Sequence, residues 1–441
     1  MPSARQVLDG AAVHAWYGLR FATARRFGLP ESAEGRLGAR RLVEVPIFPQ
    51  RPSRLSIAMG QGEVNPQSED AFFANVWAPE SADGLPVILF LHGGAWMTGG
   101  GSMPWYDGGM LAARGAVVVT VNYRLGPFGH LGASADHEFP LPVADLLLAL
   151  DWTVTNIAGY GGDPQRITVA GQSAGAWYGH LLSLLPDARG KIHRLALLSM
   201  GTRKPWSRQT RSRVTASAGR MVEPDNLGTA PVDAVLGAGL RALPPPDPNL
   251  GMAPAAYLPM ASTGLPSAFL DPVGASTDTS VEATYLRFTA QESAIFFVGS
   301  TRHLEATQDQ VDEALGPWDP ADLPAVLKRR GNYAGSSSGL SPYRQLVAAS
   351  SWRQFQRFPA EFAEALRADG AKAHLDVFEE QSQQPGLLAA HCFDLPFQFG
   401  NRSAWQDAPM LAGYDDEKFT EVSGQLVRDL VHFAAGAGPY A

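Results

Sequence analysis

Short apolar runs alternate along this chain with longer segments of helical periodicity. Residues 85–91 and 116–121 are uninterrupted apolar runs, as expected of strands that are buried on both faces. Residues 71–77 alternate between apolar and polar positions, which favours a further strand. The remaining predicted strands are 195–198, 294–298 and 374–378, and the predicted helices are 144–155, 355–368 and 419–435. Strands that alternate with helices predict an α/β fold with a mostly parallel, twisted central sheet and helices on both faces.

The segment from about 205 to 290 differs from the rest of the chain. It contains the proline-rich stretch 244–248 and many Gly, Ser and Thr residues, and its periodicity is weak. We expect this segment to leave the sheet, to be partly helical and to form an irregular cap over a site. A surface insertion without a role fits the same composition equally well. Residues 1–441 are predicted to form one domain that carries this insertion.

A strand, a sharp turn and a helix are predicted around Ser173. Residues 167–170 lead into Gly171-Gln172-Ser173-Ala174-Gly175, and an apolar, helix-compatible run follows. The two glycines let strand and helix approach closely, and the hydroxyl is held out at the start of the helix, where negative charge is favoured. The same pattern recurs at 335–339, but it follows a polar segment without a predicted strand, so we interpret that copy as a surface loop. Ser173 is therefore the predicted nucleophile.

A second glycine-rich turn follows one of the two uninterrupted apolar runs. Its sequence is His92-Gly93-Gly94-Ala95, and small residues directly after a strand let backbone N–H groups face a ligand closely. We assign the N–H groups of Gly94 and Ala95, together with that of Ala174, to an oxyanion hole, with Gly93 shaping the turn. A tight turn without that role is the alternative interpretation.

Several motifs follow one another in a fixed order along the chain. They are Ser68-Glu69-Asp70 with Asn75-Val76-Trp77, His92-Gly93-Gly94, Asn122-Tyr123-Arg124-Leu125-Gly126, Gly161-Gly162-Asp163-Pro164 before the serine turn, and Ala390-His391 with Leu395-Pro396-Phe397. In this order they resemble the type-B carboxylesterase (cholinesterase-related) family of α/β-hydrolases over roughly residues 65–405. The resemblance implies an α/β-hydrolase fold, hydrolysis of carboxylic esters by a Ser-His-Glu triad, and a structural ion pair between Glu69 and Arg124.

The resemblance also implies the catalytic base. His391 follows the last predicted strand and precedes an acidic residue and a Leu-Pro-aromatic run, as the histidine of the family does. The order of nucleophile, acid and base along the chain is also that of the α/β-hydrolases. His92 belongs to the oxyanion turn and is a poor candidate for the base.

The acid is the least regular part of the pattern. The family's Gly-x-x-x-Asp-Glu-Gly appears here as residues 299–307, with one residue inserted. Alignment from the first glycine places Leu304 at the acid position, and leucine cannot orient an imidazole. We therefore predict that Glu305 is the acid. Asp309 and Asp312 are the alternative candidates for the acid. A third alternative is that the chain has no acid in this segment.

Composition and charge limit the possible partners. The chain has 441 residues, of which 45% are hydrophobic and 18% charged, and its net charge is −8. These values allow a large core and disfavour nucleic acid or an anionic membrane as a partner. No uninterrupted apolar run approaches the roughly 18 residues of a membrane span, and the first residues lack an apolar signal core. With Cys392 as the single cysteine, no disulfide within the chain is possible. We expect a soluble, cytoplasmic protein.

The sequence thus predicts a serine carboxylesterase. Ser173 would attack the acyl carbon, His391 would transfer the proton, and Glu305 would orient His391, without a metal or an organic cofactor. The expected substrate is a small ester with apolar groups. Aromatic residues beside the motifs are candidates for lining its pocket, namely Trp96, Trp105, Tyr106 and Phe397, whereas Trp177 is expected in the core. The same triad would serve acyl transfer or the hydrolysis of an amide, carbamate or thioester, and a catalytically inactive cholinesterase-like binding module is the non-enzymatic alternative.

Overall fold

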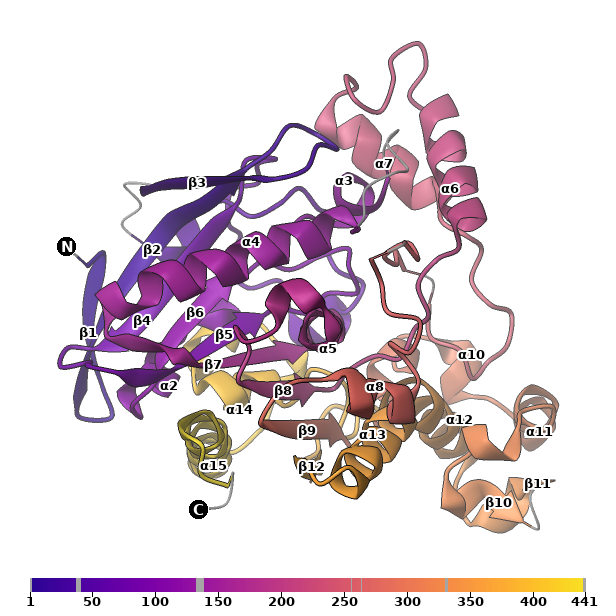
Figure 1. Ribbon diagram of the computed structural model, residues 1–441. Helices are drawn as coiled ribbons and strands as arrows, with labels where there is room; N and C mark the ends of the chain where they lie inside the picture. Colours follow the sequence, from indigo (N-terminus) through magenta and orange to yellow (C-terminus); the bar gives the residue numbers. More distant parts are fainter. Residues whose placement is uncertain are drawn as a thin grey trace.

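A ten-stranded sheet forms the centre of the computed structural model, which describes residues 2–36, 41–131, 139–254, 256–262, 264–329 and 332–438. The strand order is β1-β2-β4-β6-β5-β7-β8-β9-β12, and β3 pairs with β2 (Figure 1). The strands are β1 (Ala4–Leu8), β2 (Ala11–Thr23), β3 (Glu31–Arg36), β4 (Phe73–Pro79), β5 (Leu85–Leu91), β6 (Val117–Val121), β7 (Gly162–Gln172), β8 (Arg194–Leu198), β9 (Ala283–Thr289) and β12 (Lys372–Phe378). A separate two-stranded sheet joins β10 (Lys328–Arg329) to β11 (Asn332–Tyr333).

The sheet changes character from one side to the other. Strands β1, β2, β3 and β4 pair antiparallel, and β4 is antiparallel to β6. From β6 onward, through β5, β7, β8, β9 and β12, every pair is parallel. The carboxyl ends of these parallel strands all lie at one edge, which is where α/β sheets place their ligand sites.

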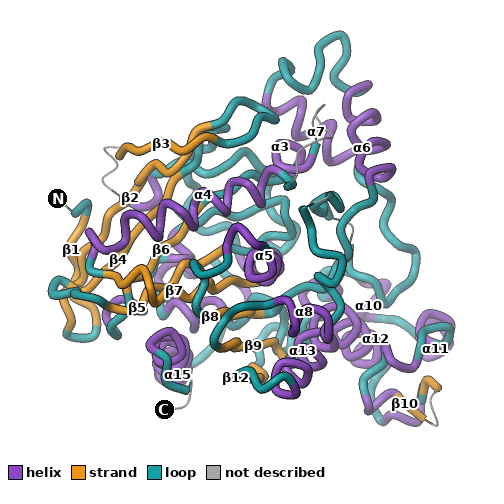
Figure 2. The backbone as a smooth tube through the Cα atoms, in the orientation of Figure 1, coloured by secondary structure: helices purple, strands orange, loops and turns teal. Residues whose placement is uncertain are grey.

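Helices cover both faces of the sheet (Figure 2). In β5, Leu89 packs into the core beneath α4, α5 and α13, and the adjacent Phe90 packs into the core beneath α2, α14 and α15. This alternation explains the uninterrupted apolar run, because both sets of side chains are buried. The longer helices are α4 (Leu141–Asn156), α5 (Ala174–Leu184), α6 (Arg208–Arg220), α7 (Val232–Ala242), α12 (Pro342–Ser351), α13 (Arg357–Ala368) and α15 (Asp416–Ala435). The shorter ones are α1 (Ser56–Met59), α2 (Gly109–Ala113), α3 (Gly126–His130), α8 (Pro272–Asp278), α9 (Ala294–Phe297), α10 (Thr301–Leu304), α11 (Gln308–Leu315) and α14 (Leu395–Phe399).

The predicted α/β fold is confirmed, but one strand was misplaced. A strand was expected at 294–298, but residues Ala294–Phe297 form helix α9. The strand of this region is β9, whose residues lie at the end of the segment that was expected to leave the sheet. A short apolar run does not distinguish a buried strand from a buried helix, which accounts for the error.

The segment from about 205 to 290 is partly helical, as predicted, with α6, α7 and α8. Helices α6 and α7 pack against each other, and α7 also contacts α3 (Figure 1). These helices lie outside the sheet, and residues Leu236, Leu240 and Tyr257 of this segment line a cavity that is described below. The interpretation of 1–441 as a single domain with an inserted cap stays a prediction.

Helix α4 and the turn after it are long and apolar enough, by length and composition alone, to cross a membrane. This stretch, Leu141–Tyr160, is 61% buried inside the protein and packs against the sheet. A core helix passes the same test of length and composition.

Two buried ion pairs fix the ends of the strands. Arg287 of β9 donates to Asp394, at 2.8 Å, and both side chains are completely buried. Arg124 is also buried, but it pairs with Asp145 of α4 at 2.5 Å. The expected pair between Glu69 and Arg124 is therefore wrong: Glu69 instead accepts hydrogen bonds from Arg26 at 2.5 and 2.7 Å.

The Arg287–Asp394 pair generates a prediction about stability. Replacing Asp394 with Ala leaves the Arg287 cation buried without this partner, so the free energy of unfolding should fall by about 3–5 kcal/mol. Guanidinium unfolding followed by tryptophan fluorescence measures the change. The matched control is Glu80→Ala, which removes one partner of the exposed Arg5–Glu80 pair and should leave the unfolding midpoint unchanged. Equal effects of the two substitutions would show that burial of the Arg287–Asp394 pair does not set its contribution.

Candidate active site

Loops that follow several parallel strands meet at the carboxyl edge of the sheet. Ser173 comes directly after β7, and the Gly93–Gly94 turn comes after β5. Glu292 lies three residues beyond β9, and His391 lies in the loop after β12. Residues that are far apart in the sequence are thus brought to one place by the sheet topology.

Ser173 is held in a strained turn between β7 and α5. Its φ is +55°, in the left-handed region that residues with a Cβ rarely adopt. Its N–H donates to the carbonyl of Leu198 at 2.9 Å, which ties the turn to β8. Gly175 is required here, because a Cβ on it would lie 2.0 Å from the carbonyl oxygen of Leu91. The tight approach of α5 to β5 holds the Ser173 hydroxyl at the edge of the sheet.

The structure brings Ser173 and His391 together, as the sequence suggested. The Ser173 hydroxyl donates to Nε2 of His391 at 2.8 Å. The other ring nitrogen, Nδ1, donates to Oε2 of Glu292 at 2.5 Å. A proton on Nδ1 leaves Nε2 free to accept, which is the tautomer that a general base requires.

Glu292 is fixed by several bonds of its own. Its side chain is fully buried, and its Oε1 accepts a hydrogen bond from the N–H of Thr289 at 2.8 Å. The backbone N–H of His391 donates to the carbonyl of Glu292 at 3.0 Å, and Gln291 and Ala389 are joined by a 3.0 Å backbone bond beside it. The loop after β9 and the loop after β12 are therefore clamped together around the His391–Glu292 contact.

The structure corrects the predicted acid. Glu305 is exposed at the end of α10, and Asp309 and Asp312 are exposed on α11, whereas Glu292 contacts His391. The error follows from the misplaced strand. Because β9 ends at Thr289 and not at residue 298, the turn that presents the acid comes earlier in the chain.

A signal for Glu292 is present in the sequence. Residues 283–289 read Ala-Thr-Tyr-Leu-Arg-Phe-Thr, which is rich in the β-branched and aromatic residues that favour strands. Weighing composition together with apolar character would have placed a strand here. Glu292 would then have been recognised as an acidic residue in the loop directly after that strand.

The glycine-rich turn after β5 presents N–H groups without partners. Gly94 has φ +120°, and a Cβ on it would lie 1.9 Å from the carbonyl oxygen of Thr98. Ala95 also has a positive φ, +54°. No described residue accepts a hydrogen bond from the N–H groups of Gly94, Ala95 or Ala174. The donors assigned to an oxyanion hole are thus available to a ligand, and Gly93 packs tightly against Gln172.

The two histidines at the site differ in charge. Burial lowers the pKa of His92 to about 4, so its ring is neutral and stacks on Tyr123 with centroids 4.3 Å apart. Burial also opposes a charge on His391, but the sulfur of Cys392 and the carboxylate of Glu292 outweigh it and raise the pKa of His391 well above its ordinary value. Of these two residues, His391 is the one that can hold a proton, which agrees with the choice of base.

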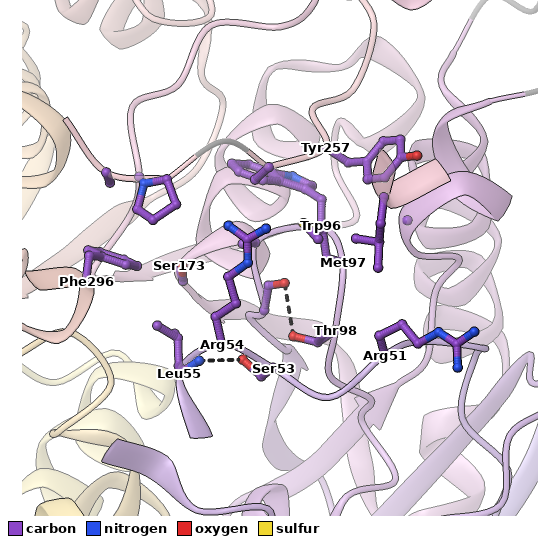
Figure 3. A pocket seen from close by; sticks show the side chains of 18 of the residues that line it. Arg51, Ser53, Arg54, Leu55, Trp96, Met97, Thr98, Ser173, Tyr257 and Phe296 are labelled. Atoms are coloured by element: carbon purple, nitrogen blue, oxygen red, sulfur yellow. Dashed lines mark hydrogen bonds between the residues drawn. The ribbon is translucent and has the colours of Figure 1, made fainter. Parts of the chain in front are cut away.

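Two cavities meet at Ser173. The first, which we call the Trp96 cavity, has a volume of about 220 Å³ and is lined mainly by apolar side chains, including Trp96, Met97, Leu236, Tyr257 and Phe355 (Figure 3). The second, the Trp105 cavity, has a volume of about 160 Å³, and Trp105, Tyr106, Met103, His391 and Cys392 are among its lining residues. Trp96, Trp105 and Tyr106 therefore line cavities as predicted.

Two other aromatic residues lie in the core. Trp177, on α5, is fully buried and packs against Trp96 and Phe269, in line with its predicted position. Phe397 was expected to line the pocket, and it is instead fully buried on α14 between Phe393 and Phe419.

Among the described residues, no group of three or more His, Cys, Asp or Glu side chains is placed to hold a metal ion.

Comparisons with known proteins agree with this architecture. The sequence profile of the carboxylesterase family matches residues 3–222. A probable N-octanoylanthranilate hydrolase, AqdA2, from Rhodococcus erythropolis is 30% identical over 94% of this chain and 87% of its own length. A phenmedipham hydrolase from Pseudarthrobacter oxydans is 28% identical over 85% of this chain and 75% of its own length. A solved PNB esterase structure is similar over 99% of this chain and 89% of that chain, with a TM-score of 0.76 and 27% identity.

The fold, with its strand-turn-helix at the serine, is that of an α/β-hydrolase. Within that class, the chain belongs to the carboxylesterase family, and it is an enzyme of that family.

The crowded turn after β5 provides a test of the site. Replacing Gly94 with Ala forces the added Cβ against Thr98 and displaces the N–H groups of the turn. We expect kcat/KM for p-nitrophenyl acetate to fall about 10²–10³-fold, the usual cost of losing one oxyanion donor. The matched control is Gly159→Ala, where a Cβ meets nothing within 4 Å. If both variants retained the activity of the parent, the turn would have no part in the reaction.

Proposed function

We propose that the protein is a serine hydrolase that cleaves carboxylic esters through an acyl-enzyme, with Ser173 as nucleophile, His391 as base and Glu292 as the acid that orients the base. The observation that carries the proposal is the continuous chain of hydrogen bonds from Ser173 through His391 to Glu292, of 2.8 and 2.5 Å. The proposal replaces Glu305 by Glu292 and retains the other two residues of the predicted triad.

In the proposed reaction, His391 Nε2 takes the hydroxyl proton as Ser173 Oγ attacks the acyl carbon. The N–H groups of Gly94, Ala95 and Ala174 stabilise the oxyanion of the tetrahedral intermediate. His391 then donates its proton to the departing alcohol oxygen, which leaves an acyl group on Ser173. Water, activated by His391, attacks the acyl carbon, and release of the acid restores the serine. Glu292 stabilises the imidazolium that forms in each half of the cycle.

A second candidate is hydrolysis of an amide on the same residues. It is favoured by the relative from Rhodococcus erythropolis, whose name describes hydrolysis of an N-acyl compound. The two activities share the acyl-enzyme and differ in whether the leaving group is an alcohol or an amine, so they are separated by assaying matched esters and amides of one acid.

Labelling of the nucleophile tests the proposal directly. A fluorescent alkyl phosphonate should label the parent protein at Ser173, and p-nitrophenyl acetate should be hydrolysed. Ser173→Ala should lose the label and reduce kcat by at least about 10³-fold, because the group that forms the covalent intermediate is gone. Mass spectrometry of the labelled peptide identifies the residue. Ser337→Ala, in the second Gly-x-Ser-x-Gly match, is the control and should label normally. A parent protein that neither labels nor hydrolyses the ester would instead support a binding module.

The assignment of Glu292 is tested by comparing Glu292→Gln with Glu305→Gln. The first variant keeps the size of the side chain but removes its charge, and kcat should fall by up to about 10⁴-fold. Because the Glu292 carboxylate raises the pKa of His391, its loss should lower that pKa. Activity requires neutral His391, so the acid limb of the kcat/KM profile should move to lower pH. Glu305→Gln should match the parent in both measurements. Loss of activity in Glu305→Gln with full activity in Glu292→Gln would reverse the assignment.

A further inference from the structure

The Trp96 cavity, next to Ser173, contains cationic side chains in an otherwise apolar lining. Arg51, Arg54 and Arg203 line it, and no Asp or Glu is among its lining residues in the described part of the chain. This excess of positive charge occurs in a protein whose net charge is −8. Arg203 is partly buried, and burying a cation in a cavity that served only neutral apolar esters would cost free energy without a compensating contact.

Arg203 is held at the cavity by its surroundings. It lies in the chain that leaves β8, where its carbonyl accepts a hydrogen bond from Nε1 of Trp177 at 3.0 Å. The preceding residue, Thr202, donates its N–H to the carbonyl of Gln354 at 2.9 Å. The guanidinium donates through one nitrogen to the carbonyls of Ala253 and Pro254, at 3.0 and 2.7 Å. The side chain is therefore positioned before any ligand arrives, which reduces the entropy that binding would cost.

The charge of Arg203 has no counter-ion in the protein. Its hydrogen-bond acceptors are backbone carbonyls, and no carboxylate of the described residues pairs with it. Burial lowers the pKa of the Arg203 guanidinium, since no nearby acid offsets the loss of water. A half-buried guanidinium without a carboxylate partner, in a cavity that Ser173 also lines, is suited to an anion, because the planar fork of N–H donors matches a carboxylate.

Arg54 adds a second cation to the lining of the cavity. It precedes α1, its side chain extends into the cavity in Figure 3, and no described residue forms an ion pair or a hydrogen bond with its guanidinium. Arg51, which like Arg54 is exposed, differs because it points away from Ser173 in the same view and pairs with Asp233 at 3.2 Å. Arg54 is therefore free to meet a ligand, whereas the charge of Arg51 is already compensated.

We propose that Arg203 and Arg54 select esters that carry a carboxylate group on an apolar body, with the carboxylate bound in the Trp96 cavity while Ser173 attacks the ester. This proposal rests on the proposed function and adds the substrate class. The apolar side chains Trp96, Leu236 and Tyr257 would pack on the body of the substrate, and the two guanidinium groups would bind its anionic end. The chemistry at the ester is that of the proposed function, since the carboxylate is not itself changed.

Matched substrates test the proposal. One pair places the charge on the leaving group, 4-(butanoyloxy)benzoate and its methyl ester, and a second pair places it on the acyl group, mono-(4-nitrophenyl) adipate and 4-nitrophenyl hexanoate. For at least one pair, kcat/KM of the parent protein should be about 10-fold or more higher for the anion than for the neutral compound. The responsive pair also shows which part of the substrate occupies the Trp96 cavity. Equal or lower values for the anion in both pairs would overturn the proposal.

Substitutions of the individual arginines show which of them interacts with the substrate carboxylate. Arg203→Met and Arg54→Met should each lower the ratio of anionic to neutral kcat/KM about 10-fold or more, and Arg203→Lys should restore part of the ratio lost in Arg203→Met. Arg51→Met is the matched control and should leave the ratio as in the parent. If Arg203→Met does not fold, Arg54→Met still decides the question, because among the described residues the Arg54 guanidinium has no hydrogen bond or ion pair to lose. A ratio unchanged in Arg54→Met and in any soluble Arg203 variant would also overturn the proposal.

A binding measurement separates this proposal from the proposed function. In Ser173→Ala, calorimetry with 4-(butanoyloxy)benzoate and mono-(4-nitrophenyl) adipate should detect binding that weakens about 10-fold or more when Arg203→Met is added. Loss of hydrolysis in the parent with this binding intact would contradict only the esterase proposal. Hydrolysis of the neutral esters without any charge-dependent binding would contradict only the anion site.

Discussion

The hydrogen bond between His391 and Glu292 is the contact on which the site depends. It joins two loops whose residues are 99 positions apart, and it fixes both the orientation and the protonation of the imidazole. Neither residue holds this geometry alone. The backbone bond from His391 to Glu292 and the bond between Gln291 and Ala389 hold the same two loops together, and the buried Arg287–Asp394 pair joins β9 to the start of α14. The parallel pairing of β9 with β12 supplies the frame on which these contacts are built.

The sequence was informative where backbone geometry restricts the choice of residue. Gly175 and Gly94 lie where a Cβ would meet a carbonyl oxygen, so glycine patterns after apolar runs led to Ser173 and to the turn after β5. The continuous run of β5 led to a strand buried on both faces. These signals are local, and each can be interpreted from a few neighbouring residues.

The acid could not be found in the same way. Glu292 has no glycine pattern around it, and its role depends on a partner from a distant loop. Its identification required the correct strand before it, but the apolar run 294–298, of which 294–297 form α9, was predicted as the strand in place of β9. The charged lining of the Trp96 cavity could not be predicted from the sequence for a related reason. Arg54 and Arg203 come from separate loops. Only the folded chain shows that neither guanidinium pairs with a described carboxylate, and that Arg203 donates only to backbone carbonyls.

The position of β9 and β12 at the end of the sheet has a consequence for the order in which the protein acquires activity. Ser173 and the turn after β5 belong to neighbouring central strands, whereas Glu292 and His391 follow the two strands at the edge. A chain that has assembled its sheet only as far as β8 carries the serine but neither member of the pair that activates it. Its hydroxyl is then an ordinary alcohol, which is a weak nucleophile. Under the proposed mechanism, reactivity toward esters therefore requires that β9 and β12 have joined the sheet, and a chain folded only as far as β8 should not react with them.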